Sequence, residues 1–159
     1  MGSDFDFLTL LAIANGVRAS HTKVALAVLL SASCASVRVD TPLYERLGGP
    51  RAIHVIVDDF VGRVTTAPRI RRFFEGSNLP LVREQVTQFI CQAAGGPRTY
   101  LGVDMKTAHV GLGISDADFD ALADDLNASL DKFNIAARDK AELLAILGRM
   151  RVDIVEKKP

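Results

Sequence analysis

One stretch of the sequence, residues 79–97, carries the signals for a helix together with its start and its end: LPLVREQVTQFICQAAGGP. Apolar side chains recur in it at steps of four, three and four residues, at Val82, Val86, Phe89 and Ala93. Because an α-helix turns about once every 3.6 residues, this spacing gathers them on one face. Proline suits a first helical turn, and the glycines that precede Pro97 suit a helix end. The stretch therefore predicts a helix over 80–94 with one buried face.

Similar apolar series lie on both sides of this stretch and begin at Ile53, Phe119 and Leu143. A second breaker of the same kind, Gly48-Gly49-Pro50, separates the first two segments. No segment alternates between apolar and polar residues with a sustained period of two, so the fold class is predicted to be all-α. Helices are expected over 42–47, 50–66, 80–94, 116–133 and 139–156.

Polar residues near the predicted helix starts suggest how the helices begin. Ser115 is expected to cap the helix that starts near Asp116, since its hydroxyl can accept a hydrogen bond from a free backbone N–H. Asp139, followed by Glu142, is expected to form a variant of the capping box at the last helix. The connection over 98–114 is expected to be irregular, with one short helical turn.

Length and composition limit the class of protein. The chain has 159 residues, with 19 basic and 19 acidic side chains and two cysteines. This length predicts one domain. A nucleic-acid-binding domain is usually clearly basic, so the balanced charge argues against a nucleic-acid partner. Two cysteines are too few for a four-cysteine zinc site or for a scaffold of several disulfides.

The first 40 residues resemble an export signal more than part of a folded domain. A basic residue and a short apolar run over 23–30 precede a series of small residues. Cys34 also suits a lipoprotein signal, in which lipidation attaches the chain to a membrane, and cleavage after Ala35 is the alternative. We therefore expect a signal and flexible extension over 1–40, a folded domain over 41–159, and a periplasmic or envelope-attached protein. An ordinary N-terminal helix in a cytoplasmic protein is the other interpretation.

Few individual residues point to chemistry. The sequence lacks a GxSxG nucleophile elbow, an HExxH zinc motif, a Walker loop and a CxxC pair. His54 precedes Asp58 by four residues and is expected to pair with it in a partly exposed position. Cys91 falls near an apolar stripe and is expected to be a buried, inert thiol. His109 lies in a glycine-rich segment, and spacing alone leaves open whether it is a metal ligand or a histidine without a functional role.

Short motifs stand in a fixed order from about Pro42 to Val155. They are LYERLGG (43–49), DF (59–60), FF and GSN (73–74 and 76–78), FIC (89–91), GGP (95–97), Tyr100, MK (105–106), AH (108–109) and GI (113–114). In this order and spacing the chain resembles the group I truncated, or 2-on-2, haemoglobins of the globin superfamily. The resemblance implies an abbreviated globin in which two helix pairs sandwich haem b.

The resemblance also implies roles for single residues. His109 falls on the proximal histidine, which binds the haem iron, and Phe74 falls where the family packs a ring on the porphyrin. Haem needs one strong axial donor and a dry slot between helices. Lys106 and Arg83 are candidates to pair with the porphyrin carboxylates. The other cofactor-binding candidates are apolar: Phe60, Val82, Val86, Phe89, Met105, Ile114 and Phe119.

The chain departs from the family on the distal side, where the gas binds. Group I members commonly have a tyrosine directly after the position of Phe60 and a glutamine on the distal helix; the matching residues here are Val61 and Val86, with Val82 nearby. A missing hydrogen bond to bound oxygen costs about 1–3 kcal/mol. We therefore expect weak oxygen retention, unless a small rotation of the helix brings Gln85 inward as a donor.

The expected function is reversible binding of a diatomic gas, oxygen and also CO or NO, at haem iron. No catalytic residue is assigned, and oxygen transport, sensing, nitric-oxide dioxygenation and peroxidase activity are left open. The apolar distal side argues against the last two, since both profit from polar groups near the ligand. The alternative, from a different class, is a cofactor-free helical envelope lipoprotein that serves protein contacts.

Overall fold

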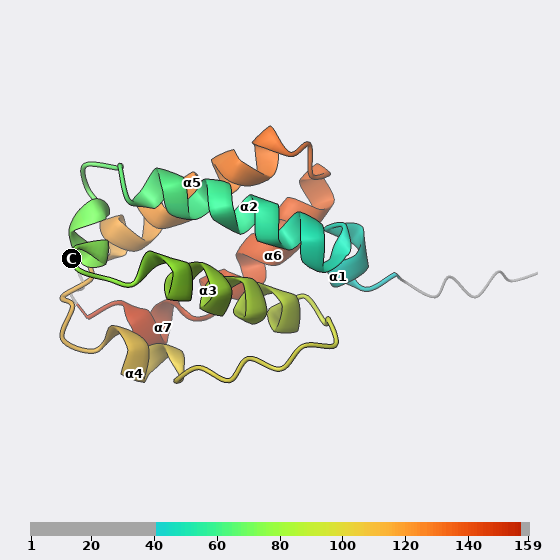
Figure 1. The fold of residues 1–159 in the computed structure, drawn as a ribbon. Coiled ribbons are helices and arrows are strands. Elements are labelled where there is room, and N and C mark those ends of the chain that lie inside the picture. Colours follow the sequence, from blue (N-terminus) through green and yellow to red (C-terminus); the bar gives the residue numbers. More distant parts are fainter. Residues whose placement is uncertain (1–40, 157–159) are drawn as a thin grey trace, which may run out of the picture. The chain divides into compact units, whose positions relative to one another are not determined.

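The computed structural model describes residues 41–156, which form α-helices and one 3₁₀ helix, with no β-strand in this part of the chain (Figure 1). The predicted all-α fold class is therefore confirmed. The elements are α1 (Leu43–Arg46), α2 (Gly49–Val64), the 3₁₀ helix η1 (Arg71–Phe74), α3 (Leu79–Ala93), α4 (Met105–His109), α5 (Asp116–Lys132), α6 (Ala137–Gly148) and α7 (Arg151–Ile154).

Two helix pairs make up the body of the domain. Helix α2 packs against α3 and α5, and α5 packs against α6. Figure 1 shows α2 and α3 running alongside each other, with α5 and α6 behind them and the short helices α4 and α7 below. The core between the pairs is formed by apolar side chains of the predicted stripes, among them Ile53, Val57, Phe60, Ile90, Leu126, Leu130 and Leu143.

The cap predicted at the start of α5 is confirmed. Helix α3 also has a cap, from a residue for which the sequence predicted no such role. At α5, the backbone N–H of Asp118 donates to the Ser115 hydroxyl, and the N–H of Ser115 donates to the Asp118 carboxylate at 3.0 Å. At α3, the side chain of Asn78 accepts a hydrogen bond from the N–H of Leu81. Each cap satisfies a backbone donor that the helix itself leaves without a partner.

The prediction of one continuous helix over 139–156 is wrong. The chain forms α6 and α7 instead, and α6 starts at Ala137 with Ala136 in the capping position. The expected capping box of Asp139 and Glu142 is also wrong, because both carboxylates bind Arg46 on α1, with 2.7 Å between Arg46 Nε and Asp139 Oδ1. A charge-assisted bond to an arginine 93 residues away outweighs a local cap at this site.

An acidic side chain, Asp59, ties α2 to α5. Its carboxylate accepts hydrogen bonds from Lys132, from Arg63 Nε at 2.7 Å and from the Ser129 hydroxyl at 2.9 Å. These donors, Lys132 first, lower the pKa of Asp59 to about 2. Because this pKa lies below that of an ordinary aspartate, the cluster stabilises the fold above about pH 4 and loses its effect toward pH 2.

The end of α3 approaches α1 closely at Gly95-Gly96-Pro97. The N–H of Tyr44 donates to the carbonyl of Ala94 at 2.9 Å. A β-carbon added at Gly96 would lie 2.7 Å both from the carbonyl oxygen of Cys91 and from Cε2 of the Tyr44 ring. Only glycine fits this close approach without displacement of the ring or the backbone.

We expect Gly96→Ala to lower the free energy of unfolding by about 1–3 kcal/mol, because an added methyl group overpacks this contact. Chemical denaturation measures the loss. The matched control is Gly62→Ala on α2, where nothing lies within 4 Å of the added carbon, so its stability should be unchanged or rise by up to about 1 kcal/mol. Equal effects of the two substitutions would contradict this account of Gly96.

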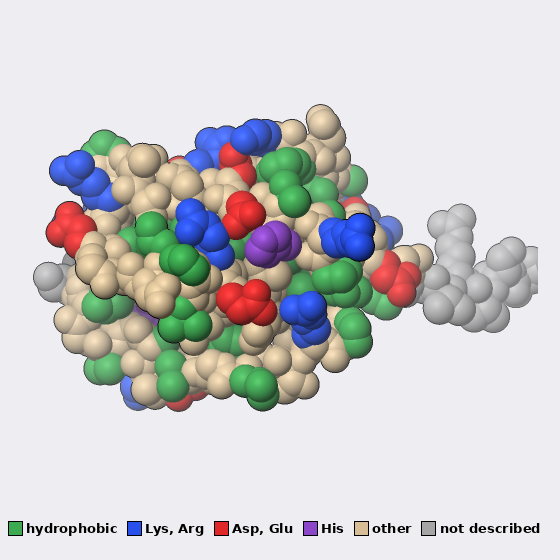
Figure 2. Space-filling view, viewed as in Figure 1, with side chains coloured by type: hydrophobic (Ala, Val, Ile, Leu, Met, Phe, Trp, Pro, Cys, Tyr) green, Lys and Arg blue, Asp and Glu red, His purple; other side chains and the backbone are tan. Residues whose placement is uncertain are grey.

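Charges of both signs are interspersed over the face seen in Figure 2, between apolar side chains. Within residues 41–156, no helix is both long enough and apolar enough to cross a membrane. The predicted export signal, Cys34 and the extension through residue 40 lie outside the described residues.

Candidate functional site

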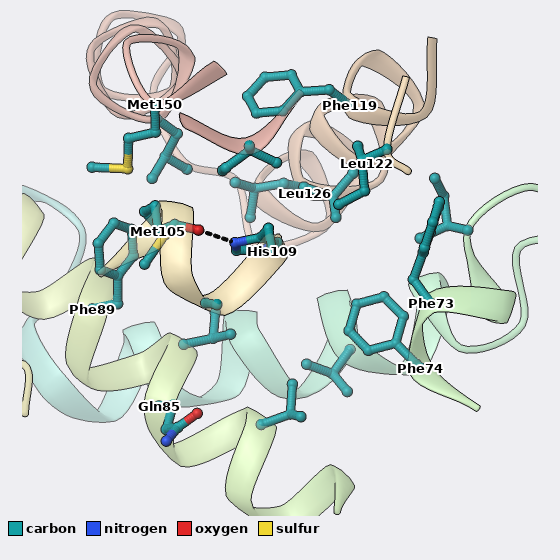
Figure 3. A pocket seen from close by; sticks show the side chains of 18 of the residues that line it. Phe73, Phe74, Gln85, Phe89, Met105, His109, Phe119, Leu122, Leu126 and Met150 are labelled. Atoms are coloured by element: carbon teal, nitrogen blue, oxygen red, sulfur yellow. Dashed lines mark hydrogen bonds between the residues drawn. The ribbon is translucent and has the colours of Figure 1, made fainter. Parts of the chain in front are cut away.

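A cavity of about 340 Å³ lies between the helix pairs. Side chains from α2, η1, α3, α4, α5, α6 and α7 form its wall, so nearly the whole described domain contributes to it. Figure 3 shows Phe73 and Phe74 on one side of this cavity and Phe119, Leu122 and Met150 on another, with His109 and Met105 on α4 beside it. The wall is mostly apolar, as in sites that bury a large organic ligand.

One imidazole, that of His109, belongs to the wall of this cavity. Its Nδ1 lies 2.7 Å from the carbonyl oxygen of Met105, and this contact is the dashed line in Figure 3. A carbonyl only accepts hydrogen bonds, so Nδ1 carries a proton, and in the neutral form of the ring Nε2 then keeps its lone pair. This is the state in which a histidine binds a metal.

Helix α4, which carries His109, is held at its start by Asp104. The Asp104 carboxylate accepts hydrogen bonds from the N–H and the hydroxyl of Thr107 at 2.9 and 2.7 Å, and these bonds lower the pKa of Asp104. A helix of five residues is too short to be stable alone, so such end contacts decide whether it forms. The predicted short helical turn before residue 114 is thus confirmed, with His109 at its last position.

Phenylalanine rings line a large part of the cavity. The ring of Phe89 meets that of Tyr100 edge to face, with 5.4 Å between centroids, and the guanidinium of Arg151 lies 4.5 Å from the ring centroid of Phe119. These contacts hold the rings in defined orientations. The structure brings together at the cavity almost all predicted cofactor residues: Phe60, Phe74, Val82, Val86, Phe89, Met105, His109, Ile114 and Phe119.

The predicted distal residues also reach the cavity. Val61 is fully buried, and Val82 and Val86 are half-buried on α3. Gln85 belongs to the wall too, although it is exposed, and Figure 3 places it on α3 at the side opposite Phe119 and Met150. The valines offer no hydrogen-bond donor, so Gln85 is the polar side chain that α3 contributes to the cavity wall.

The structure does not place the two predicted cationic partners at the cavity wall. Lys106 is exposed on α4, and Arg83 Nε lies 3.4 Å from a carboxylate oxygen of Asp58. His54 Nε2 lies 3.5 Å from the other oxygen of the same carboxylate, in the exposed pairing that the sequence predicted. Cys91 is buried, as predicted, and burial raises the pKa of its thiol.

An unpredicted carboxylate, Asp118, also belongs to the cavity wall and is 3% exposed. Arg69 Nε and Arg72 Nη2 lie 2.9 and 3.2 Å from its oxygens. The hydrogen bond from Ser115, followed by the two arginines, holds the pKa of Asp118 below its usual range. The carboxylate therefore stays charged, and Arg72 ties α5 to η1, which carries Phe74, while Arg69 ties α5 to the turn that precedes η1.

Sequence reasoning missed other wall residues. Leu122 and Leu126 follow the apolar stripe of α5, so helical spacing predicted their burial but not that they face a cavity. Phe73 stands next to Phe74 within a quoted motif. Met150 and Ile154 continue the apolar series that begins at Leu143, and both reach the cavity although the chain breaks between α6 and α7.

These residues fit haem, the cofactor implied by the sequence. One imidazole with a free Nε2 lone pair supplies a single axial donor, and the surrounding wall is apolar and aromatic, as a porphyrin face requires. Among residues 41–156, no group of three or more His, Cys, Asp or Glu side chains could hold a bare metal ion. Fold and site together define an all-α protein that is suited to hold a flat, apolar cofactor through one histidine.

Comparison with known proteins identifies the family. The bacterial-like globin family matches residues 42–156, and the chain belongs to it. A group 1 truncated haemoglobin of a Synechocystis species is 36% identical over 110 residues, which cover 67% of this chain and 89% of the relative. That of Mycolicibacterium paratuberculosis is 30% identical over 112 residues, covering 70% and 82%.

Solved structures agree with this assignment. The Fe(III) form of the truncated haemoglobin from Tetrahymena pyriformis is similar, with a TM-score of 0.71 and 29% identity over 74% of this chain and all of that chain. The cyanomet 2/2 haemoglobin of a Synechococcus species, which has covalently attached haem, gives a TM-score of 0.69 and 30% identity with the same coverage. The predicted group I truncated globin fold is confirmed.

Proposed function

We propose that this globin holds haem b through His109 and binds a diatomic gas reversibly on the opposite side of the cofactor. The observation that carries the proposal is the His109 imidazole, whose Nδ1 proton is engaged by Met105 and which lies in an apolar, aromatic cavity. Globin membership and the names of the relatives support the same function. Neither the fold nor the relatives support the alternative of a cofactor-free lipoprotein.

The residues of this site would have different roles in holding the cofactor. Haem, when bound, would supply the iron at which a diatomic gas is held. His109 would hold this iron, and the hydrogen bond to the Met105 carbonyl fixes which ring nitrogen is available. Phe60, Phe74 and the other apolar wall residues would exclude water and pack against the cofactor. The exposed Lys106 remains a candidate for the porphyrin carboxylates outside the cavity.

The distal side sets the preference among gases. Val61, Val82 and Val86 supply no hydrogen bond, and loss of such a bond to bound oxygen costs about 1–3 kcal/mol, or about 5- to 150-fold in affinity. CO is less polar and profits little from a donor. We therefore infer weak oxygen retention and comparatively strong CO binding. This distal side also offers little support for nitric-oxide dioxygenase or peroxidase activity.

The place of the protein in the cell is inferred from the sequence pattern alone. The basic, apolar and small-residue segments over 23–36 support export to the periplasm or envelope. Within that proposal, lipidation of Cys34 would attach the globin domain to a membrane, and cleavage after Ala35 would release it.

Absorption spectra of the purified protein test the proposed function. We expect a strong Soret band in the ferric and ferrous forms and a stable CO form. The oxygen form should lose its ligand rapidly, because the distal valines cannot donate a hydrogen bond to bound oxygen. A colourless protein that stays folded and takes up no added haemin would contradict the proposal and favour the cofactor-free alternative.

A further inference from the structure

The segment that follows His109 leaves α4 in an unusual backbone path. Gly111 and Gly113 both have positive φ angles, of 82° and 64°. Residues other than glycine rarely adopt this conformation, and it turns successive backbone N–H groups toward a common side. Such a concave group of N–H donors suits a negatively charged oxygen.

A carboxylate from the far end of the described chain binds these donors. Glu156 accepts hydrogen bonds from the N–H of Gly111 and of Gly113, at 2.6 Å each, and uses one oxygen for each donor. Its own N–H donates to the carbonyl of Ile114 at 2.9 Å. Bonds to an ionised acceptor are about twice as strong as neutral ones, so this three-bond contact is a firm link between segments more than 40 residues apart.

The segment that carries Glu156 is itself anchored to the domain. Helix α7 packs against α4, and Figure 1 shows the two side by side. At the start of α7, Arg151 binds Asp120 and also Asp116 on α5, with 2.7 Å between Arg151 Nη1 and Asp116 Oδ1. The same guanidinium lies over the ring of Phe119 at the cavity wall. Glu156 therefore holds the segment after His109 from a fixed base.

We propose that Glu156 is a positioning residue for His109. It acts through Gly111 and Gly113, which follow the histidine by two and four residues. Asp104 holds the first turn of the five-residue helix α4, and Glu156 holds the chain directly after its last residue. With both ends held, the imidazole keeps one orientation toward the cavity. The proposal rests on the proposed function, in which His109 is the axial ligand.

The test substitutes Glu156→Gln in the full chain, with Glu45→Gln, an exposed glutamate on α1, as the matched control. We expect faster hydrogen exchange at the amides of Gly111 and Gly113 in the variant, by about tenfold or more, in both the haem-free and the haem-loaded protein. We also expect a shifted iron–histidine stretching frequency in the ferrous form and about 10- to 100-fold faster haem loss, the range found when partners of metal ligands are removed. Glu156→Asp keeps the charge and should restore part of each property.

The outcomes separate this proposal from the proposed function. A Glu156→Gln protein with a normal Soret band, an unchanged iron–histidine frequency and unchanged haem loss overturns the positioning role and leaves haem binding intact. Unchanged amide exchange at Gly111 and Gly113 overturns it as well. If the unsubstituted chain takes up no haem, the proposed function fails, and with it the role of His109 that Glu156 is proposed to support.

Discussion

Protein carrying His109→Ala is expected to lose its Soret band and to bind haem more than about 100-fold more weakly than the unchanged chain. Removal of a residue that merely supports a metal ligand already costs about 10- to 100-fold in metal affinity, so loss of the ligand itself should cost more. Among residues 41–156, His109 is the one histidine in the cavity wall, and the structure offers no second imidazole there. Haemin titration followed by absorption spectroscopy measures the loss.

A rescue experiment and a second histidine make this result specific. In His109→Gly the deleted ring leaves space beside the cavity, so added imidazole should restore an axial-ligand spectrum. His54→Ala is the matched control, because His54 is exposed and pairs with Asp58 on the surface. Its spectrum and haem affinity should be unchanged. An unaltered axial spectrum in His109→Ala would show that another side chain binds the iron.

Substitution Val86→Gln is expected to slow oxygen dissociation by about 5- to 150-fold, with a much smaller change for CO. The change introduces a hydrogen-bond donor on α3 at a half-buried position of the cavity wall, and a bond to bound oxygen is worth about 1–3 kcal/mol. CO carries little charge at its outer atom and gains less. Stopped-flow measurement of both dissociation rates gives the ratio that checks the prediction.

Two further variants separate hydrogen bonding from shape. Val86→Leu enlarges the side chain without adding a donor, so the oxygen dissociation rate should stay within a few-fold of its original value. Gln85→Ala should have little effect, since Gln85 is exposed at the margin of the cavity. A large rise in the oxygen dissociation rate in Gln85→Ala would show that this glutamine already supplies the donor, and the account of an all-valine distal side would be wrong.

Helix type and approximate position followed from local signals. The stripe through Val82, Val86 and Phe89 predicted a helix over 80–94, and α3 spans Leu79–Ala93. Apolar spacing and glycine breakers act within a few residues of each other, so a sequence displays them directly. The cap at Ser115 was predictable for the same reason, since donor and acceptor lie three residues apart.

The cofactor residue needed more than local signals. Spacing alone left the role of His109 open, and its proposed role as axial ligand comes from the order of motifs over residues 43–114. The same order of motifs predicted that the distal valines and most of the aromatic residues line the cavity. The partners of the charged residues were predicted less well from the sequence, because a long side chain pairs with whichever partner the fold brings near. Arg83 lies beside Asp58, and no signal pointed to Asp118 in the cavity wall.

The sequence by itself determined the all-α class, the main helices and the family, and it singled out His109 as the candidate axial ligand, because periodic burial and ordered motifs are properties of the chain. Tertiary structure decided the break between α6 and α7, the pairing of Asp139 and Glu142 with Arg46, and the contact of Glu156 with Gly111 and Gly113. The last two contacts join residues more than 40 positions apart, whose polar groups meet only after the helices have packed. Most of the apolar cavity wall therefore followed from the sequence, whereas these long-range contacts required the packed fold.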